Sequence, residues 1–277
     1  MNLNKEMVLK IIDNALREDI GTGDITTQAV IDQDQEMTAD ILAKEDGIIV
    51  GLDVAFWVFE YLDSSVEFRP LVKEGERVAR GTVIAKVSGL TTSILTGERL
   101  ALNFLQRMSG IATQTAYYRS LVKDYDVRIV DTRKTTPGLR ILEKWAVKLG
   151  GGANHRFGLY DAVMIKDNHI RAVEGIQEAV KRARQNIPHT MKIEVETESL
   201  ADVKEALAAK ADIIMLDNMS FEMMEEAVRL IANKAIVEAS GGITAENIIE
   251  VAKTGIDVIS LGTLTHSIKS LDISLNF

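Results

Sequence analysis

Six short apolar runs in the second half of the chain each end in charged, amide or glycine residues. The runs cover residues 127–130, 162–165, 193–195, 213–216, 236–239 and 258–261. Each has the length of a buried strand, and segments with helical spacing lie between them. Charged side chains are costly inside a sheet but useful at its edge. Charges at the same end of every strand therefore indicate one shared site, as in a parallel β/α barrel.

The first half of the chain has a different pattern. Residues 6–18 place their apolar positions on one helical face, and a glycine-rich break follows at residues 21–24. Residues 36–90 are typical of a β-rich segment. Residues 96–121, rich in Leu, Phe, Met and Ala, predict a long helix.

Several residues mark the predicted ends of helices in the second half. Pro137 suits the first position of a helix that Gly150 would end. Ser199, Ser220 and Thr244 each follow a predicted strand and are expected to cap the next helix.

The strand count limits the architecture. The six strands occupy residues 127–261, whereas eight complete strand–helix units need roughly 200 residues or more. The expected fold is α/β, with an irregular, incomplete β/α barrel. An open doubly wound sheet is the alternative, but no G-x-G-x-x-G segment follows a strand to open a helix.

Composition and charge exclude several classes of protein. The chain has 277 residues, no cysteine and a net charge of −9, which argues against disulfides, thiolate chemistry and general nucleic-acid binding. The N-terminus lacks the apolar core of a secretory signal. The longest apolar stretch, residues 47–62, falls short of the roughly 20 residues of a membrane helix. We expect a cytoplasmic protein that binds neither membrane nor nucleic acid.

Cations gather at two of the predicted strand ends. Arg133 and Lys134 follow the first strand, Lys166 follows the second, and His155 and Arg156 lie between them. Two adjacent cations alone would suggest a solvated basic turn. Several cations at one barrel mouth instead predict an anion site, because a bound anion relieves their repulsion.

Carboxylates occupy the next two strand ends. Glu194 and Glu196 are two residues apart on one strand and face the same side, and Asp217 ends the following strand. These groups could hold sugar hydroxyls, a divalent metal or a developing cation, or could simply neutralise the lysines. Glu196 and Asp217 are favoured as functional residues because they lie nearer the strand tips.

The last two strand ends carry glycine. Ser240, Gly241 and Gly242 follow one strand and Gly262 the other. Phosphate often binds after the final strands of a barrel, where glycine lets the backbone approach closely. His266 lies four residues further on, and a lone histidine is more often a packed residue than a ligand.

Long motifs along almost the whole chain resemble quinolinate phosphoribosyltransferases. They are Glu18 to Thr27, Gly97-Glu98-Arg99, Ser109 to Thr113, Asp131 to Arg140, Gly150 to Arg156, Met164 to His169 and Leu261 to Ser267. Thr136, where leucine is common in that family, is a minor departure.

The resemblance implies an N-terminal α/β sandwich-like domain, residues 1–112, and a catalytic barrel, residues 113–266. It also implies that the tail, residues 267–277, returns to the first domain. The implied assembly is a homodimer whose active sites are shared between subunits. The implied reaction converts quinolinate and phosphoribosyl pyrophosphate into nicotinate mononucleotide, pyrophosphate and CO2, with Mg2+, in NAD biosynthesis.

The resemblance also implies roles for individual residues. Quinolinate is expected to meet Arg99 of the partner, Arg133, His155, Arg156 and Lys166. Phosphoribosyl pyrophosphate is expected to meet Lys134, Glu196, Asp217, Ser240, Gly241, Gly262 and His266. The expected catalytic residues are Lys134, Lys166, Glu196 and Asp217, the last two also holding the metal.

Three alternatives remain open at this point. Lys166 could be the nucleophile of a Schiff-base aldolase, which requires an unprotonated amine. The chain could be the related protein of molybdenum-transport operons. It could also be a sensor that binds phosphoribosyl pyrophosphate without turnover.

Overall fold

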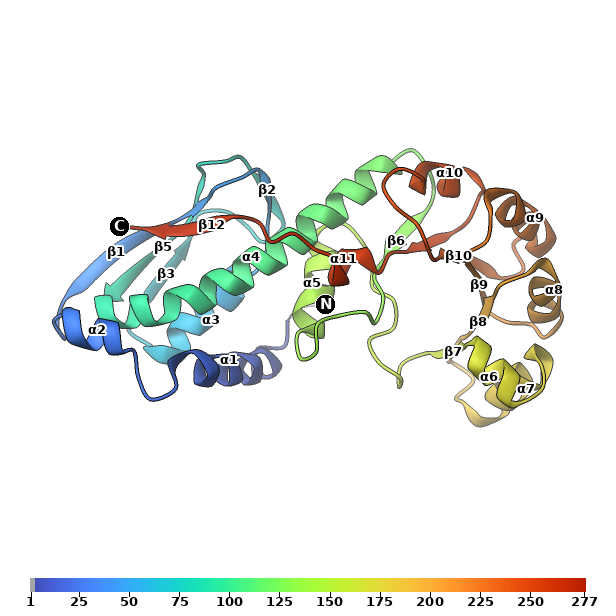
Figure 1. Ribbon diagram of the computed structural model, residues 1–277, viewed down its shortest axis with the longest axis horizontal. Helices are drawn as coiled ribbons and strands as arrows, with labels where there is room; N and C mark the ends of the chain where they lie inside the picture. The colour runs from blue at the N-terminus through green and yellow to red at the C-terminus, as the bar shows by residue number, and fades with distance from the viewer. Residues whose placement is uncertain (1–2) are drawn as a thin grey trace. The chain divides into compact units, whose positions relative to one another are not determined.

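The computed structural model describes residues 3–277, whose contacts divide them into two compact units (Figure 1). The first unit extends to Ala116 and also includes Thr135–Gly151 and Leu264–Phe277. The second unit consists of Tyr117–Lys134 and Gly152–Thr263. The two domain boundaries expected from the sequence stay predictions.

An antiparallel sheet with the strand order β12-β1-β5-β3 forms the first unit's larger sheet (Figure 1). Its strands are β1 (Glu36–Ala43), β3 (Glu67–Pro70), β5 (Val83–Leu90) and β12 (Ile273–Asn276). Two short strands, β2 (Gly47–Ile49) and β4 (Glu76–Val78), pair separately. Because β12 pairs with β1, the C-terminal tail completes a sheet begun near the N-terminus.

Helices accompany these sheets. They are α1 (Lys5–Ile20), α2 (Ile25–Val30), α3 (Leu52–Leu62), α4 (Thr91–Leu121), α5 (Arg140–Leu149) and α11 (Thr263–His266). The helix predicted for residues 6–18 is confirmed as α1, which buries Val8, Ile12 and Leu16.

The β-rich expectation for residues 36–90 is confirmed by β1 to β5, but it missed helix α3, which lies inside that range. Its residues Val54, Ala55, Val58 and Phe59 are buried. Their spacing matches one face of a helix, a signal that the surrounding strands obscure in the sequence.

The start of α5 also differs from expectation. The helix begins at Arg140 rather than at Pro137. Gly138 lies between them with a φ of +83°, which no right-handed helix contains, so the chain must turn before the helix can start.

Two of the three predicted helix caps are confirmed. The hydroxyl groups of Ser199 and Ser220 accept hydrogen bonds from the first turns of α8 and α9. Thr244 does not cap a helix, because α10 begins only after Asn247. The Asn247 side chain instead accepts the N–H of Thr244 and closes a turn before the helix.

Six parallel strands form the sheet of the second unit, in the order β6-β11-β10-β9-β8-β7 (Figure 1). They are β6 (Arg128–Val130), β7 (Val163–Ile165), β8 (Ile193–Thr197), β9 (Ile213–Asp217), β10 (Ile236–Ser240) and β11 (Val258–Ser260). Helices α6 (Asp167–Ala172), α7 (Ile176–Asn186), α8 (Leu200–Ala208), α9 (Phe221–Ile231) and α10 (Ile248–Lys253) connect them. All six predicted strands and the incomplete barrel are therefore confirmed.

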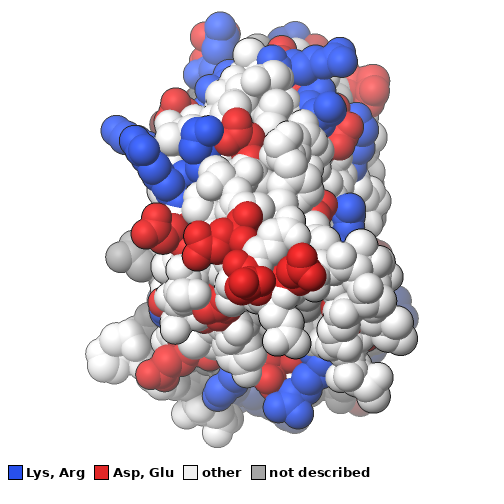
Figure 2. All heavy atoms as spheres, turned by 90° about the vertical axis from the view of Figure 1, so that its left-hand side faces the viewer, with Lys and Arg blue, Asp and Glu red and all other residues white. Residues whose placement is uncertain are grey.

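Acidic side chains outnumber basic ones over the whole chain, which has a net charge of −9. Figure 2 shows one face on which the acidic groups gather across the middle, with Lys and Arg above and below them. None of the helices in residues 3–277 is both long and apolar enough to cross a membrane.

Candidate active site

Three of the predicted site residues lie at the carboxyl ends of neighbouring strands in the second unit. Glu196 lies in β8, Asp217 ends β9, and Lys166 directly follows β7, where its ammonium group contacts the Glu196 carboxylate. Burial and the negative charge of Glu196 raise the pKa of Asp217, whereas Asn218, Lys166 and Lys134 lower it. The structure thus brings Lys134, Lys166, Glu196 and Asp217 together.

Two arginines form the second part of the site. Burial and the positive charge of Arg133 lower the pKa of Arg156, and the carboxylate of Glu194 opposes that shift. The Arg156 guanidinium donates to the carbonyl oxygen of Ala162 at 3.2 Å and contacts the Met164 sulfur at 3.5 Å. These contacts hold Arg156 beside another cation, as expected where an anionic group binds.

The segment that carries Arg156 is attached to the sheet through Asp131. The buried Asp131 carboxylate accepts hydrogen bonds from the Asn154 side chain at 2.7 Å and the His155 N–H at 2.9 Å. A parallel bridge between Val130 and Ala153 continues the contact. A segment without a regular strand therefore lies along β6, one edge of the incomplete barrel.

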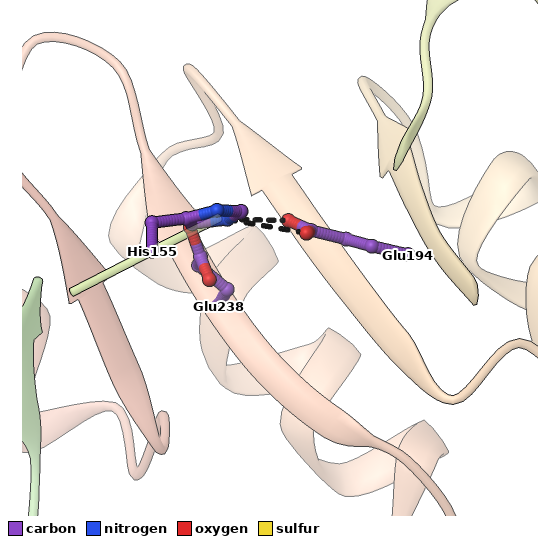
Figure 3. A group of neighbouring side chains, drawn as sticks. All are labelled: His155, Glu194 and Glu238. Carbon is purple, nitrogen blue, oxygen red and sulfur yellow. Dashed lines mark hydrogen bonds and ion pairs between the residues drawn. The ribbon is translucent and has the colours of Figure 1, made fainter. Parts of the chain in front are cut away.

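His155 points toward two buried carboxylates, Glu194 on β8 and Glu238 on β10 (Figure 3). Its Nε2 lies 3.2 Å from Glu194 Oε2 and 3.5 Å from Glu238 Oε1. Its Nδ1 accepts the Arg156 N–H at 2.7 Å. Burial and the charge of Glu194 raise the pKa of Glu238 to about 7, with His155 and Ser260 opposing the shift.

A cavity of about 580 Å³ extends from this cluster toward the amino ends of the strands. The first residues of four strands line it: Arg128, Ile213, Ile236 and Val258. Arg156 lines the same cavity as His155, Glu194 and Glu238.

The glycine loop after β10 is constrained by its neighbours. Gly241 and Gly242 have φ values of +86° and +60°, which favour glycine. A Cβ atom on Gly241 would lie 2.3 Å from Oδ1 of Asn218. The Asn218 side chain in turn donates to Asp217 at 3.0 Å, and its N–H donates to the Ser240 carbonyl. The close packing of the Gly241 backbone against Asn218 is thus linked to the position of Asp217.

The remaining predicted residues lie elsewhere in the chain. Gly262 follows β11 in the second unit. Arg99 on α4 and His266 on α11 belong to the first unit. His266 Nδ1 lies 2.7 Å from the Ser267 hydroxyl. The expected roles of Arg99 and His266 stay predictions.

Sequence reasoning missed Glu238. The residue interrupts the apolar run 236–239, and it lies two positions before Ser240, so both side chains face the same side of the sheet. That spacing was the signal that could have identified Glu238 as a candidate site residue. The role of Glu238 depends on His155 and Glu194, which come from distant parts of the chain.

The class of protein follows from this arrangement. Lys166, Glu196 and Asp217 lie at the carboxyl ends of parallel strands, which is where β/α-barrel enzymes carry out their chemistry, and Arg133 and Arg156 form a second cationic group. The fold and site define an α/β enzyme that binds anionic substrates.

Comparison with known proteins shows which family the chain belongs to. Residues 24–109 match the N-terminal domain of quinolinate phosphoribosyl transferase, and residues 111–276 match its C-terminal domain. The chain is 47% identical to the probable nicotinate-nucleotide pyrophosphorylase [carboxylating] of Bacillus subtilis, covering 99% of this chain and 94% of that protein. The crystal structure of NadC from Streptococcus pyogenes has a TM-score of 0.96 and 45% identity, covering 100% of this chain and 98% of that one.

A more distant likeness concerns the fold alone. The nicotinate-nucleotide pyrophosphorylase structure from Pyrococcus furiosus has a TM-score of 0.72 at 17% identity, covering 99% of this chain and 76% of that one. The two matching family models and the 47% identical relative show that the chain belongs to the quinolinate phosphoribosyltransferase family.

Proposed function

We propose that this enzyme transfers the phosphoribosyl group of phosphoribosyl pyrophosphate to the ring nitrogen of quinolinate. Loss of CO2 then gives nicotinate mononucleotide, and pyrophosphate is the other product. The observation that carries the proposal is the presence of two cationic groups in a chain of net charge −9: Arg133 with Arg156, and Lys134 with Lys166 near Glu196 and Asp217.

The arginine pair is suited to the two carboxylates of quinolinate. A guanidinium presents a planar fork that matches a carboxylate, and two such groups side by side repel each other until an anion lies between them. Arg133 and Arg156 would therefore orient the ring, and Lys166 would contribute a further charge. His155 belongs to the predicted binding set, but both of its ring nitrogens face protein groups.

The carboxylates are suited to the ribose. When pyrophosphate leaves, positive charge develops on the sugar carbon, and fixed carboxylates nearby stabilise that charge. Glu196 and Asp217 would provide this and would also hold the ribose hydroxyls, while Lys134 would contact the departing pyrophosphate. The pyridine nitrogen carries no proton, so its attack requires no general base.

Glu196 and Asp217 also fit a magnesium ion. They are oxygen ligands, the kind that Mg2+ prefers, and a cation would oppose the burial and the repulsion by Glu196 that raise the pKa of Asp217. The ion would supply charge for the pyrophosphate oxygens. The 5-phosphate would lie on the backbone of Ser240, Gly241 and Gly262, with His266 nearby.

The assembly we propose is a homodimer in which Arg99 of one subunit completes the site of the other. Its support is the place of Arg99 in a family motif on α4, which belongs to a different unit from the sheet that carries the other site residues. A cytoplasmic location, likewise, stays a prediction.

The Schiff-base alternative conflicts with the geometry. A nucleophilic lysine must be unprotonated, whereas the direct contact with Glu196 stabilises the charged ammonium of Lys166. Borohydride trapping with carbonyl substrates should therefore leave Lys166 unmodified.

One assay tests the function. Purified protein, quinolinate, phosphoribosyl pyrophosphate and Mg2+ should give nicotinate mononucleotide and one CO2 per nucleotide. Nicotinate, with one carboxylate, should react poorly, since an unpaired buried charge costs about 2–5 kcal/mol. Equal turnover of nicotinate, or nucleotide formation without CO2, would contradict the proposal. Binding of phosphoribosyl pyrophosphate without any product would identify a sensor.

A further inference from the structure

His155, Glu194 and Glu238 form a buried cluster that the proposed chemistry does not use (Figure 3). The side chains are 12%, 3% and 4% exposed, in that order. Glu238 Oε1 accepts no hydrogen bond from the described residues, and the Nε2 atom of His155 lies 3.5 Å from it. Two carboxylates in such a place are costly unless the cluster has a structural or functional use.

A metal ion is the first use to test against the geometry. The ligand atoms of the three residues lie within 4.8 Å of one another. However, a metal on Nε2 requires the ring proton on Nδ1, where it needs an acceptor. In this structure Nδ1 faces a donor, the Arg156 N–H at 2.7 Å. The proton therefore lies on Nε2, directed at the carboxylates, and the arrangement does not suit a metal.

The same hydrogen bonds link the cluster to Arg156. The Nε2–H group is directed at Glu194, whose Oε2 is 3.2 Å away, and Glu238 Oε1 lies 3.5 Å from the same nitrogen, so the ring is held between the two carboxyl groups. The ring in turn accepts the main-chain N–H of Arg156. Asp131 accepts the N–H of His155 itself. These contacts thus connect the main chain around Arg156 to three places in the sheet. They are strand β8, strand β10 and the end of β6.

Glu194 also acts on the arginine through its charge. Its carboxylate raises the pKa of Arg156, whereas Arg133 lowers it. A fixed negative charge behind two adjacent cations reduces their repulsion while no substrate is bound. Glu194 would therefore hold the guanidinium of Arg156 in place beside that of Arg133.

We propose that His155, held between Glu194 and Glu238, is a positioning residue that orients Arg156 for a quinolinate carboxylate and does not itself bind the substrate. The inference rests on the proposed function, in which Arg156 contacts quinolinate. It assigns a role to Glu194 and Glu238, and it replaces the direct contact expected for His155 with an action through its neighbour.

Two substitutions of His155 distinguish the contributions of its two ring nitrogens. His155→Gln removes the acceptor that faces Arg156, whereas His155→Asn retains an acceptor close to the position of Nδ1. We expect His155→Gln to raise the quinolinate KM about tenfold, the effect of one unsatisfied buried group. The KM for phosphoribosyl pyrophosphate should not change. His155→Asn should raise the quinolinate KM by a smaller factor than His155→Gln does. Equal losses in the two variants would overturn the proposal.

A double-mutant cycle with Arg156→Ala decides whether His155 acts through Arg156. If it does, adding His155→Gln to Arg156→Ala should cause no further rise in the quinolinate KM. If His155 touches quinolinate directly, the two losses in affinity should multiply, and the inference is wrong.

Further measurements keep the outcomes distinct. Arg156→Ala alone must raise the quinolinate KM. A normal value would refute the proposed substrate site rather than the positioning role. Circular dichroism and thermal unfolding establish that each variant is folded. If His155→Gln does not fold, Glu194→Gln serves in the same cycle, with the same expected loss that disappears when Arg156 is alanine.

Discussion

Replacing Glu238 with glutamine should change how the stability of this protein depends on pH. Burial raises the pKa of Glu238 from 4.5 to about 7 in the folded state. In the unfolded chain the group is in water and ionises near the ordinary value. Glutamine resembles the protonated carboxyl group and cannot ionise, so Glu238→Gln removes this one titration.

The sign follows from where the proton is bound. Between pH 4.5 and 7 the folded protein retains the Glu238 proton and the unfolded chain releases it. Stability due to this group is complete below pH 4.5 and is lost as the pH rises through 7. A shift of this size corresponds to about 3 kcal/mol, at about 1.4 kcal/mol per pKa unit.

The assay is urea unfolding of both proteins from pH 4.5 to pH 8. The stability of Glu238→Gln relative to the parent should increase by about 3 kcal/mol across that range. Glu246→Gln is a suitable control. Glu246 is exposed, and hydrogen bonds from Thr244 and its own main chain lower its pKa. Its contribution to stability is therefore complete above about pH 4.5, and Glu246→Gln should leave the pH dependence across this range nearly unchanged. Parallel stability curves for Glu238→Gln and the parent would refute the reasoning, because they would mean that Glu238 is ionised throughout.

Three further predictions concern the proposed site. Mixed dimers of Arg99→Ala and Glu196→Ala subunits should regain activity, since each would contain one intact site; no recovery despite demonstrated subunit exchange would place Arg99 in the site of its own chain. Arg133→Lys should mainly raise the quinolinate KM, whereas Lys134→Ala should also lower kcat, and equal KM increases with unchanged kcat would remove the distinction. Gly241→Ala should fold but bind phosphoribosyl pyrophosphate weakly, and normal binding by calorimetry would rule out the 5-phosphate at this loop.

The fold was predictable where the sequence repeats one pattern. Each apolar run followed by polar residues became a strand of the parallel sheet, so the position of Asp217 or Lys166 at a strand end followed directly. Helix caps depended on single side chains. Ser199 and Ser220 fulfilled that role, but Thr244 lies in a turn that Asn247 closes.

The His155 cluster shows where prediction from the sequence stops. Glu194 was visible as a carboxylate on an inward face, yet its use could not be decided between neutralising lysines and taking part in chemistry. The answer depends on Glu238 and on the ring orientation of His155, which are set by the contact between β8, β10 and the segment beside β6. Contacts between distant segments determine such roles, and no local spacing contains them.

The role of Thr136, at a position where leucine is common in the family, also depends on contacts between distant segments. Its hydroxyl accepts a hydrogen bond from Arg107 on α4 at 2.6 Å, and its N–H donates to Glu143 on α5 at 3.2 Å. Arg107 is already paired with the buried Glu143 carboxylate at 2.6 Å. The hydroxyl therefore adds one hydrogen bond, worth about 1 kcal/mol, to an arginine whose charge is neutralised without it. Leucine at this position would forgo that bond and leave the ion pair intact, which explains how the position can accommodate either residue.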